Sequence, residues 1–337
     1  MPDRTIPPVT TPTPTNTGDT LESPKAAPGK YEEYQSICRT NEYDHIFYFS
    51  EDLKNKRIKL LRDKISSGKD VSKIKIRLLK EYVDQRKTPA FNELYSEVKN
   101  MKLTPYENSL VDAYDAYQQK KLKVARDILV KLIAPNIKNI ESAKFLAEIY
   151  KEQGNFFEAA QIYYDLNKQQ SGGFYDFLCE ALILDSHHAD GEKACQKAIK
   201  ETPHNPYSVV FLGISYREKD MRVEAIEQFT NSLKVKETEM GLTCLAELYF
   251  IDNKFAAAVK YFEKSLALTP QSARALIGLG WAQLKDKNTK DALLTFKKVC
   301  HADRKNEVEI RKAYKYLMAQ NSPEAKKFID LIQTCNE

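Results

Sequence analysis

The clearest structural signal in the chain is Glu239–Ser272, which reads EMGLTCLAELYFIDNKFAAAVKYFEKSLALTPQS. Its apolar residues fall into two runs, and their spacing of three and four positions is typical of one face of an α-helix. Asn253 separates the runs and Pro270 follows the second, and both residue types favour a turn or a helix end. The stretch therefore predicts two antiparallel helices joined by a short turn.

The same pattern recurs along the chain, and a small residue at the start of each second helix gives its register. These residues are Ala125, Ala159, Gly191, Ala225, Ala258 and Ala292, which are 34, 32, 34, 33 and 34 positions apart. One further step reaches Ala325, and one step back reaches Phe91. One helix pair cannot bury its own apolar side, so a repeat of this length predicts units that stack on one another.

The residue types within each unit resemble those of the tetratricopeptide repeat family. The quoted stretch carries Leu242, Leu245, Ala246, Tyr249, Ala258, Phe262 and Pro270, and the next unit places Leu276, Leu279, Gly280, Ala292 and Phe296 at the same offsets. The resemblance extends from about Val71 to the C-terminus and is most complete over Ile140–Asn306. It implies an all-α fold, a right-handed α-solenoid whose concave wall is formed by the first helix of each unit.

Three regions are expected along the chain. Residues 1–30 are rich in Pro and Thr without apolar periodicity, which predicts a disordered tail. Residues 31–104 hold an aromatic stretch and basic helices, and we expect an N-terminal cap with a degenerate repeat. Residues 105–337 are expected to form the repeat superhelix with a C-terminal capping repeat.

Sequence motifs for catalysis or metal binding are missing. No C-x-x-C, G-x-S-x-G, H-E-x-x-H or G-x-G-x-x-G occurs in the chain. The adjacent His187 and His188 would point in different directions on a helix, which disfavours a shared metal ion. The sequence therefore predicts a protein that is not an enzyme and that has no cofactor, no metal and no small-molecule substrate.

The six cysteines lie at least 16 residues apart, and most fall on predicted buried helix faces. We interpret them as reduced, apolar core residues, which suits a reducing compartment. No N-terminal secretion signal is apparent and no run approaches ~18 apolar residues. These features predict a cytoplasmic protein without a membrane span.

The resemblance also implies a binding groove, lined by the positions of each first helix that are not needed for packing within the unit. The predicted partner-binding residues are Tyr207, Val210, Ile214, Arg217, Glu247, Phe250, Ile277 and Trp281. A secondary set is Tyr114, Tyr117, Lys144 and Glu148. Packing of the same residues against the chain itself is the competing interpretation.

The predicted function is that of a scaffold or adaptor which binds a peptide or helix of another protein, in a bacterial signalling, motility or envelope-assembly complex by analogy. An alternative rests on residues 51–103, which hold 15 Lys and Arg against eight Asp and Glu. The basic helices at 54–86 could bind nucleic acid or another anionic surface, although Ile and Leu rather than aromatic residues lie between the cations. Pairing with a second copy of the chain is a further alternative.

Overall fold

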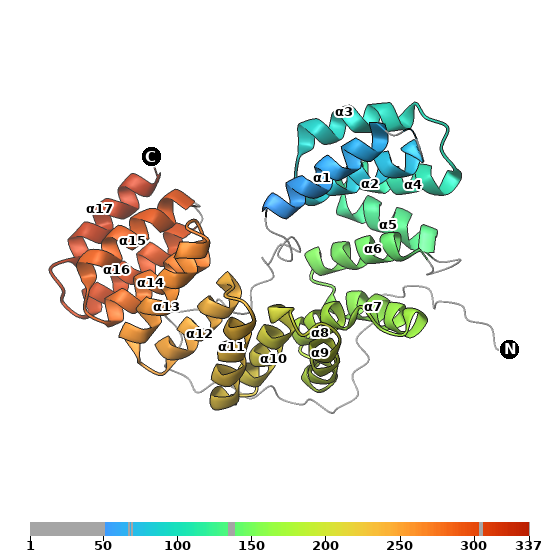
Figure 1. The fold of residues 1–337 in the computed structure, drawn as a ribbon. Coiled ribbons are helices and arrows are strands. Elements are labelled where there is room, and N and C mark those ends of the chain that lie inside the picture. The colour runs from blue at the N-terminus through green and yellow to red at the C-terminus, as the bar shows by residue number, and fades with distance from the viewer. Residues whose placement is uncertain (1–50, 67, 69, 134–138, 303–305, 337) are drawn as a thin grey trace, which may run out of the picture. The chain divides into compact units, whose positions relative to one another are not determined.

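The structure is a computed structural model that describes residues 51–66, 68, 70–133, 139–302 and 306–336. The predicted tail at 1–30 and the aromatic stretch up to residue 50 lie outside these residues. Throughout the described ranges the chain consists of helices and turns, as the repeat pattern predicts (Figure 1). The chain divides into two compact units. The first unit takes the described residues between 51 and 241, and the second unit takes those between 242 and 336.

The first unit is a series of helices that pack in chain order. Helices α4 with α5, α6 with α7, α8 with α9 and α10 with α11 form hairpins, and α1, α2 and α3 pack in sequence before them. Their bounds are α1 Glu51–Ser66, α2 Val71–Asp84, α3 Thr88–Lys99, α4 Pro105–Gln118, α5 Leu122–Ile133, α6 Ile140–Glu152, α7 Phe156–Gln170, α8 Tyr175–Leu184, α9 His188–Glu201, α10 Pro206–Glu218 and α11 Arg222–Val235.

The second unit continues the same arrangement. Its helices are α12 Glu239–Ile251, which enters the unit at Leu242, α13 Phe255–Leu268, α14 Ala273–Lys285, α15 Thr289–Ala302, α16 Glu307–Ala319 and α17 Ala325–Asn336. Helix α14 packs on both α13 and α15, and α17 packs on both α15 and α16. One apolar core connects these hairpins, with Phe262, Phe296 and Phe328 fully buried within it.

The register predicted from the small residues is confirmed. Ala125, Ala159, Ala225, Ala258 and Ala292 are fully buried, and each lies in the first turns of a second helix. Close packing explains the small residues on the facing helices as well. A Cβ atom added to Gly213 would lie 2.6 Å from Cε1 of Phe229, and one added to Gly280 would lie 2.8 Å from Cε2 of Phe296. Both pairs are 16 residues apart, so the same contact recurs in different hairpins.

The turn inside each hairpin follows one backbone pattern. One residue in it adopts a left-handed conformation, with φ between 52° and 77°, and these residues are Lys120, Gly154, Ser186, Asp220, Asn253, Lys287 and Asn321. The next residue donates its backbone N–H to a carbonyl five positions earlier, as Asn155 does to Tyr150 at 2.8 Å. This closes the helix end in the manner of a Schellman motif. The turn positions repeat with the spacing of the small residues.

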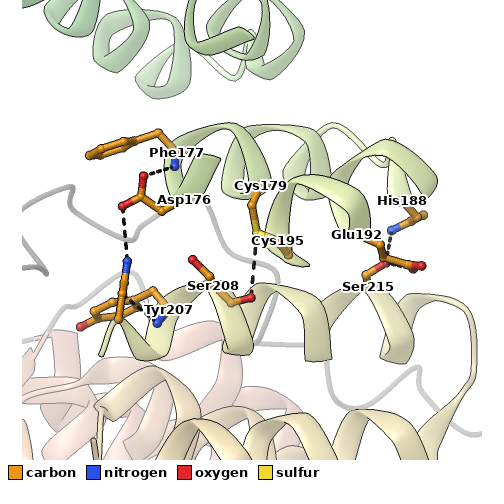
Figure 2. Close-up of a disulfide and its surroundings, with 10 residues drawn as sticks. Asp176, Phe177, Cys179, His188, Glu192, Cys195, Tyr207, Ser208 and Ser215 are labelled. Atoms are coloured by element: carbon orange, nitrogen blue, oxygen red, sulfur yellow. Dashed lines mark hydrogen bonds between the residues drawn. A yellow bond between two sulfur atoms is a disulfide. The ribbon is translucent and has the colours of Figure 1, made fainter. Parts of the chain in front are cut away.

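The interpretation of the cysteines as reduced is wrong. Cys179 in α8 is disulfide-bonded to Cys195 in α9 (Figure 2), and Cys300 in α15 to Cys335 in α17. The first bond lies within one hairpin, and the second joins two successive second helices. Disulfides form and persist mainly in oxidising compartments. The predicted cytoplasmic location therefore loses the support that it drew from reduced cysteines.

Within the described ranges, no helix combines the length and the apolar character that crossing a bilayer requires.

Candidate protein-binding surface

The first helices of the hairpins in the first unit lie next to one another in a layer, which we name the inner layer: α2, α4, α6, α8 and α10. Helix α2 packs on α4, and α8 packs on α10. Helix α6 is joined to this layer by polar contacts on both sides. Lys80 of α2 donates to Glu148 of α6, and Lys151 of α6 donates to Glu180 of α8. The secondary set of predicted residues lies on this layer.

An aromatic cluster occupies the layer where α4 meets α6. The rings of Tyr114 and Tyr117 pack edge-on against Phe145, with centroids 5.1 and 5.2 Å away. The Tyr114 hydroxyl donates to Glu141 at 3.2 Å and the Tyr117 hydroxyl donates to Glu152. Burial and these carboxylates raise the pKa of both phenols. Tyr114 is fully buried, so only Tyr117 presents surface to a partner.

Sequence reasoning did not single out Lys80, which it counted only among the cations of the basic helices at 54–86. Its ammonium lies 3.0 Å from Glu148, pairs with Asp84, and is 4.9 Å from the centre of the Phe145 ring. Burial lowers the pKa of Lys80, but the two carboxylates outweigh it and the pKa is raised overall. Desolvation, only partly offset by Lys80, raises the pKa of Asp84 to about 6. The apolar neighbours Leu78 and Leu79 were the available signal that this lysine lies inside.

Further along the layer, Lys144 and Asp176 stand beside aromatic rings. The Lys144 ammonium is 5.1 Å from the centre of the Phe177 ring, a cation–π distance, and Phe177 stacks on Tyr163. Asp176 accepts from the side-chain amide of Asn205 at 3.3 Å, and burial raises the pKa of Asp176. Lys144, Asp176 and Phe177 are all partly exposed.

The predicted partner-binding residues of α10 differ in accessibility. Tyr207 is partly exposed, and burial raises its pKa to about 12. Val210 and Ile214 are buried, with exposed fractions of 0% and 1%. Arg217 pairs with the neighbouring Glu218. In the first unit, Tyr207 is therefore the aromatic member of this set that remains accessible.

The predicted residues in the second unit are mostly core residues. Trp281 is fully buried, packs edge-on against Phe296 and Tyr316, and donates its indole N–H to Glu309 at 3.2 Å. Glu247 is fully buried as well. Phe250 and Ile277 are partly buried and pack against the apolar core. The contacts of Trp281 therefore favour the interpretation in which the predicted residues pack against the chain itself.

A buried ion pair links α6 to α8. The Lys151 ammonium contacts the Glu180 carboxylate, and the two side chains are only 2% and 7% exposed. Neither charge is accessible to a partner, although both positions belong to the inner layer. Such a pair fixes how neighbouring helices align, because either charge alone would be costly to bury.

The basic helices at 54–86 use several of their cations inside the chain. Arg57 pairs with Glu81, and Lys75 lies 2.8 Å from Glu97 of α3. Arg62 donates to the hydroxyl of Tyr82 at 2.8 Å. Together with Lys80, these contacts neutralise or occupy part of the positive charge on which the anionic-surface alternative depends.

One polar cluster includes the residue types of a hydrolytic triad but not their arrangement. Ser215 lies 3.2 Å from Nδ1 of His188 and donates to Glu192 at 2.6 Å (Figure 2). In a triad the histidine lies between the serine and the carboxylate. Here the serine lies between the other two and is fully buried, so it is not placed to attack a substrate.

Across the part of the chain that the structure describes, no three His, Cys, Asp or Glu side chains converge as metal ligands would. His187 is exposed and makes local contacts with Asp185, which fits its place in the hairpin turn.

Comparison with known proteins agrees with the hairpin architecture. A tetratricopeptide repeat model matches residues 245–307. In three dimensions, a chain of the APC/C hetero-tetramer Cut9–Hcn1 matches with a TM-score of 0.57, at 13% identity over 83% of this chain and 52% of that one. The family model thus identifies a tetratricopeptide repeat at residues 245–307. The search of curated protein sequences found no match.

Two more solved structures match this chain in three dimensions. Yeast Tom70 has a TM-score of 0.55 at 15% identity, over 80% of this chain and 59% of that one. A tetratricopeptide repeat protein from Parabacteroides merdae has a TM-score of 0.50 at 15% identity, over 69% of this chain and 99% of that one.

At these identities the matches establish the shared fold alone. The present chain spans about half of the Cut9–Hcn1 chain and 59% of the Tom70 chain. Tetratricopeptide repeats generally mediate protein–protein interactions, which is the coarse function that the family supports.

Proposed function

We propose that this tetratricopeptide repeat protein is a non-catalytic scaffold that binds a segment of another protein on the inner layer of its first unit. The observation that supports this most directly is the row of partly exposed side chains Tyr117, Lys144, Glu148, Asp176, Phe177 and Tyr207. They lie on successive first helices. Aromatic rings of this kind bury much area with little loss of conformational freedom, which makes them effective anchors at interfaces.

The charges on this surface indicate the chemistry of the partner. Lys80 and Lys151 are occupied by internal ion pairs, whereas Glu141, Glu152 and Asp176 remain partly or fully exposed. The accessible surface is therefore mainly acidic, with aromatic rings between the carboxylates. A helical or extended segment that carries aromatic or aliphatic anchors together with Lys or Arg fits it best.

A charge swap tests the proposal with little change to the core. The binding of fluorescent 15-residue peptides, graded in basic charge and in apolar anchors, is measured on the full chain. The variant Lys144→Glu with Asp176→Lys changes the inner layer, and Asp190→Lys with Lys193→Glu makes the same exchange on α9, where both side chains are about 70% exposed.

We expect the intact chain to prefer basic, anchored peptides, and the inner-layer variant to weaken binding about tenfold or more, while the α9 variant binds as the intact chain does. Equal binding by both variants would exclude this surface. Retention on nucleic acid with a steep salt dependence would favour the alternative based on the basic helices instead.

A further inference from the structure

A pocket on the first three helices is not used by the proposed function. Helix α2 packs on both α1 and α3, and residues of all three helices and of the turn before α3 line the pocket. Its volume is about 310 Å³. This lies at the lower end of the range of about 300 to 1,000 Å³ that is usual for pockets that bind small ligands. Its polar lining residues are Asn55, Lys59, Arg62, Asp63, Tyr82 and Lys87.

Positive charge exceeds negative charge in this pocket. Its cations are Lys59, Arg62 and Lys87, and Asp63 is the carboxylate of its lining. Lys87 donates to the side-chain oxygen of Asn55 at 2.8 Å, which does not offset its charge. Within the described part of the chain, none of the three cations forms an ion pair. Three cations against one carboxylate leave a net charge of +2 for an anion to neutralise.

The guanidinium of Arg62 is oriented by Tyr82. Its Nε and Nη2 atoms donate to the Tyr82 hydroxyl at 3.1 and 2.8 Å. A hydroxyl, unlike a carboxylate, leaves the positive charge uncompensated. A guanidinium has five N–H donors in a planar fork, so Arg62 keeps further donors for an anion in the pocket.

The Tyr82 hydroxyl also has a hydrogen to donate. The Tyr82 side chain is buried, with an exposed fraction of 3%, and its oxygen accepts from Arg62. Among the described residues, no group accepts the hydroxyl hydrogen. Most buried polar groups are hydrogen-bonded, so an acceptor oxygen of a ligand would complete the bonding of this phenol.

We infer that this pocket binds a phosphate monoester. Such a group carries a charge of about −2 at pH 7, and its oxygens accept strong hydrogen bonds from Arg, Lys and hydroxyl donors. The net charge of the pocket matches this dianion better than a single carboxylate or a phosphodiester. Ile58 and Ala90, which also line the pocket, offer apolar contact to the group that carries the phosphate. A phosphorylated protein side chain and a small phosphate ester both present this chemistry.

Calorimetric titration of the full chain tests the inference. We expect phenyl phosphate to bind more tightly than benzoate and than phenyl methyl phosphate, which is a diester. A 15-residue phosphoserine peptide then distinguishes the two sources. If it binds at least as tightly as phenyl phosphate, the ligand is a phosphorylated protein, and if it binds more weakly, the ligand is a small ester. Absence of phenyl phosphate binding, or equal binding of benzoate or of the diester, would overturn the inference.

Two substitutions of opposite sign locate the site. Arg62→Gln should weaken phenyl phosphate binding about tenfold or more, because charge-assisted hydrogen bonds are lost. Arg77→Gln is the matched control, because Arg77 is an exposed arginine of α2 that does not line the pocket. Asp63→Asn removes the carboxylate of the lining and should tighten binding severalfold.

The gain expected for Asp63→Asn keeps the test independent of folding. Arg62→Gln also removes a contact with the buried Tyr82, whereas Asp63 is exposed and forms no ion pair in the described residues. Equal weakening by Arg62→Gln and Arg77→Gln would mean that diffuse positive charge, and not the pocket, attracts the ester. An unchanged affinity of Asp63→Asn would contradict the site as well. The inference does not rest on the proposed partner surface, because no residue named for that surface lines the pocket.

Discussion

The two units share one hairpin register but differ in the chemistry that they place at the same repeat position on their first helices. In the first unit this position holds Tyr114, Glu148, Glu180 and Ile214, and in the second it holds Glu247 and Trp281. Tyr114 and Trp281 each donate to a glutamate of the following first helix, Glu141 or Glu309. Glu148 and Glu180 instead accept from lysines of preceding first helices.

This difference shows which property the repeat constrains and which it leaves free. Packing of the two helices within a hairpin is maintained by small residues and phenylalanines at fixed offsets. The repeat position that holds Tyr114 and Trp281 is less constrained. It accepts any side chain for which a neighbouring hairpin supplies aromatic packing, a hydrogen bond or an ion pair. In the first unit, Glu148 and Glu180 are satisfied by lysines at this position, whereas at Trp281 the second unit uses a buried ring.

Removal of the Trp281 ring should have the largest effect on this comparison. Trp281→Ala leaves a cavity between Phe296 and Tyr316 and removes a donor to Glu309, so we expect a loss of about 4 kcal/mol in the free energy of unfolding. Chemical denaturation measures the loss, and hydrogen exchange should localise it to residues 242–337. Phe157→Ala, at a side chain 46% exposed on α7, is the control and should cost far less.

Breaking the ion pair of the first unit should have the next largest effect. Lys151→Ala leaves the Glu180 carboxylate buried without its cation, which should cost about 3 kcal/mol. Replacing both residues, by Lys151→Met with Glu180→Leu, should restore most of the stability, because no uncompensated charge then remains. If the double variant is as unstable as the single one, the pair contributes more than charge compensation.

The sequence predicts the hairpins well and the inner layer poorly, for a physical reason. A small residue every 32 to 34 positions determines helix packing within a unit, so Ala125 and Ala292 are buried as predicted. The environment of a side chain on the inner layer depends on the neighbouring hairpins, and the sequence of one repeat does not specify these. Lys80 was therefore counted only among the cations that could bind an anionic surface, and Trp281 was predicted to contact a partner.

The disulfide of α8 and α9 could have been predicted from the repeat itself. Gly213 and Gly280 lie against the phenylalanine 16 residues later, and Cys179 occupies the equivalent position of its own unit, 16 residues before Cys195. The register thus placed both sulfurs at a close contact. No short cysteine motif marks this bond, because its two sulfurs come from a pair of repeat positions 16 residues apart.

The smallest expected effect is a pH dependence confined to the first unit. The pKa of Asp84 is about 6 in the folded protein, against an ordinary value of 3.8, so between these values the folded state holds more protons than the unfolded state. The stability that Asp84 contributes is thus largest below about pH 4, falls as the pH rises towards 6, and is constant above it. The Asp84 side chain is 39% exposed, so solvent screening should keep the change below about 1 kcal/mol.

Denaturation of the intact chain and of Asp84→Asn between about pH 4 and 6 measures the difference in the free energy of unfolding. Asp63→Asn, which changes an exposed carboxylate on α1, is the control. The opposite result would be an intact chain that gains stability relative to Asp84→Asn as the pH rises. It would mean that Lys80 lowers the pKa of Asp84 by more than desolvation raises it.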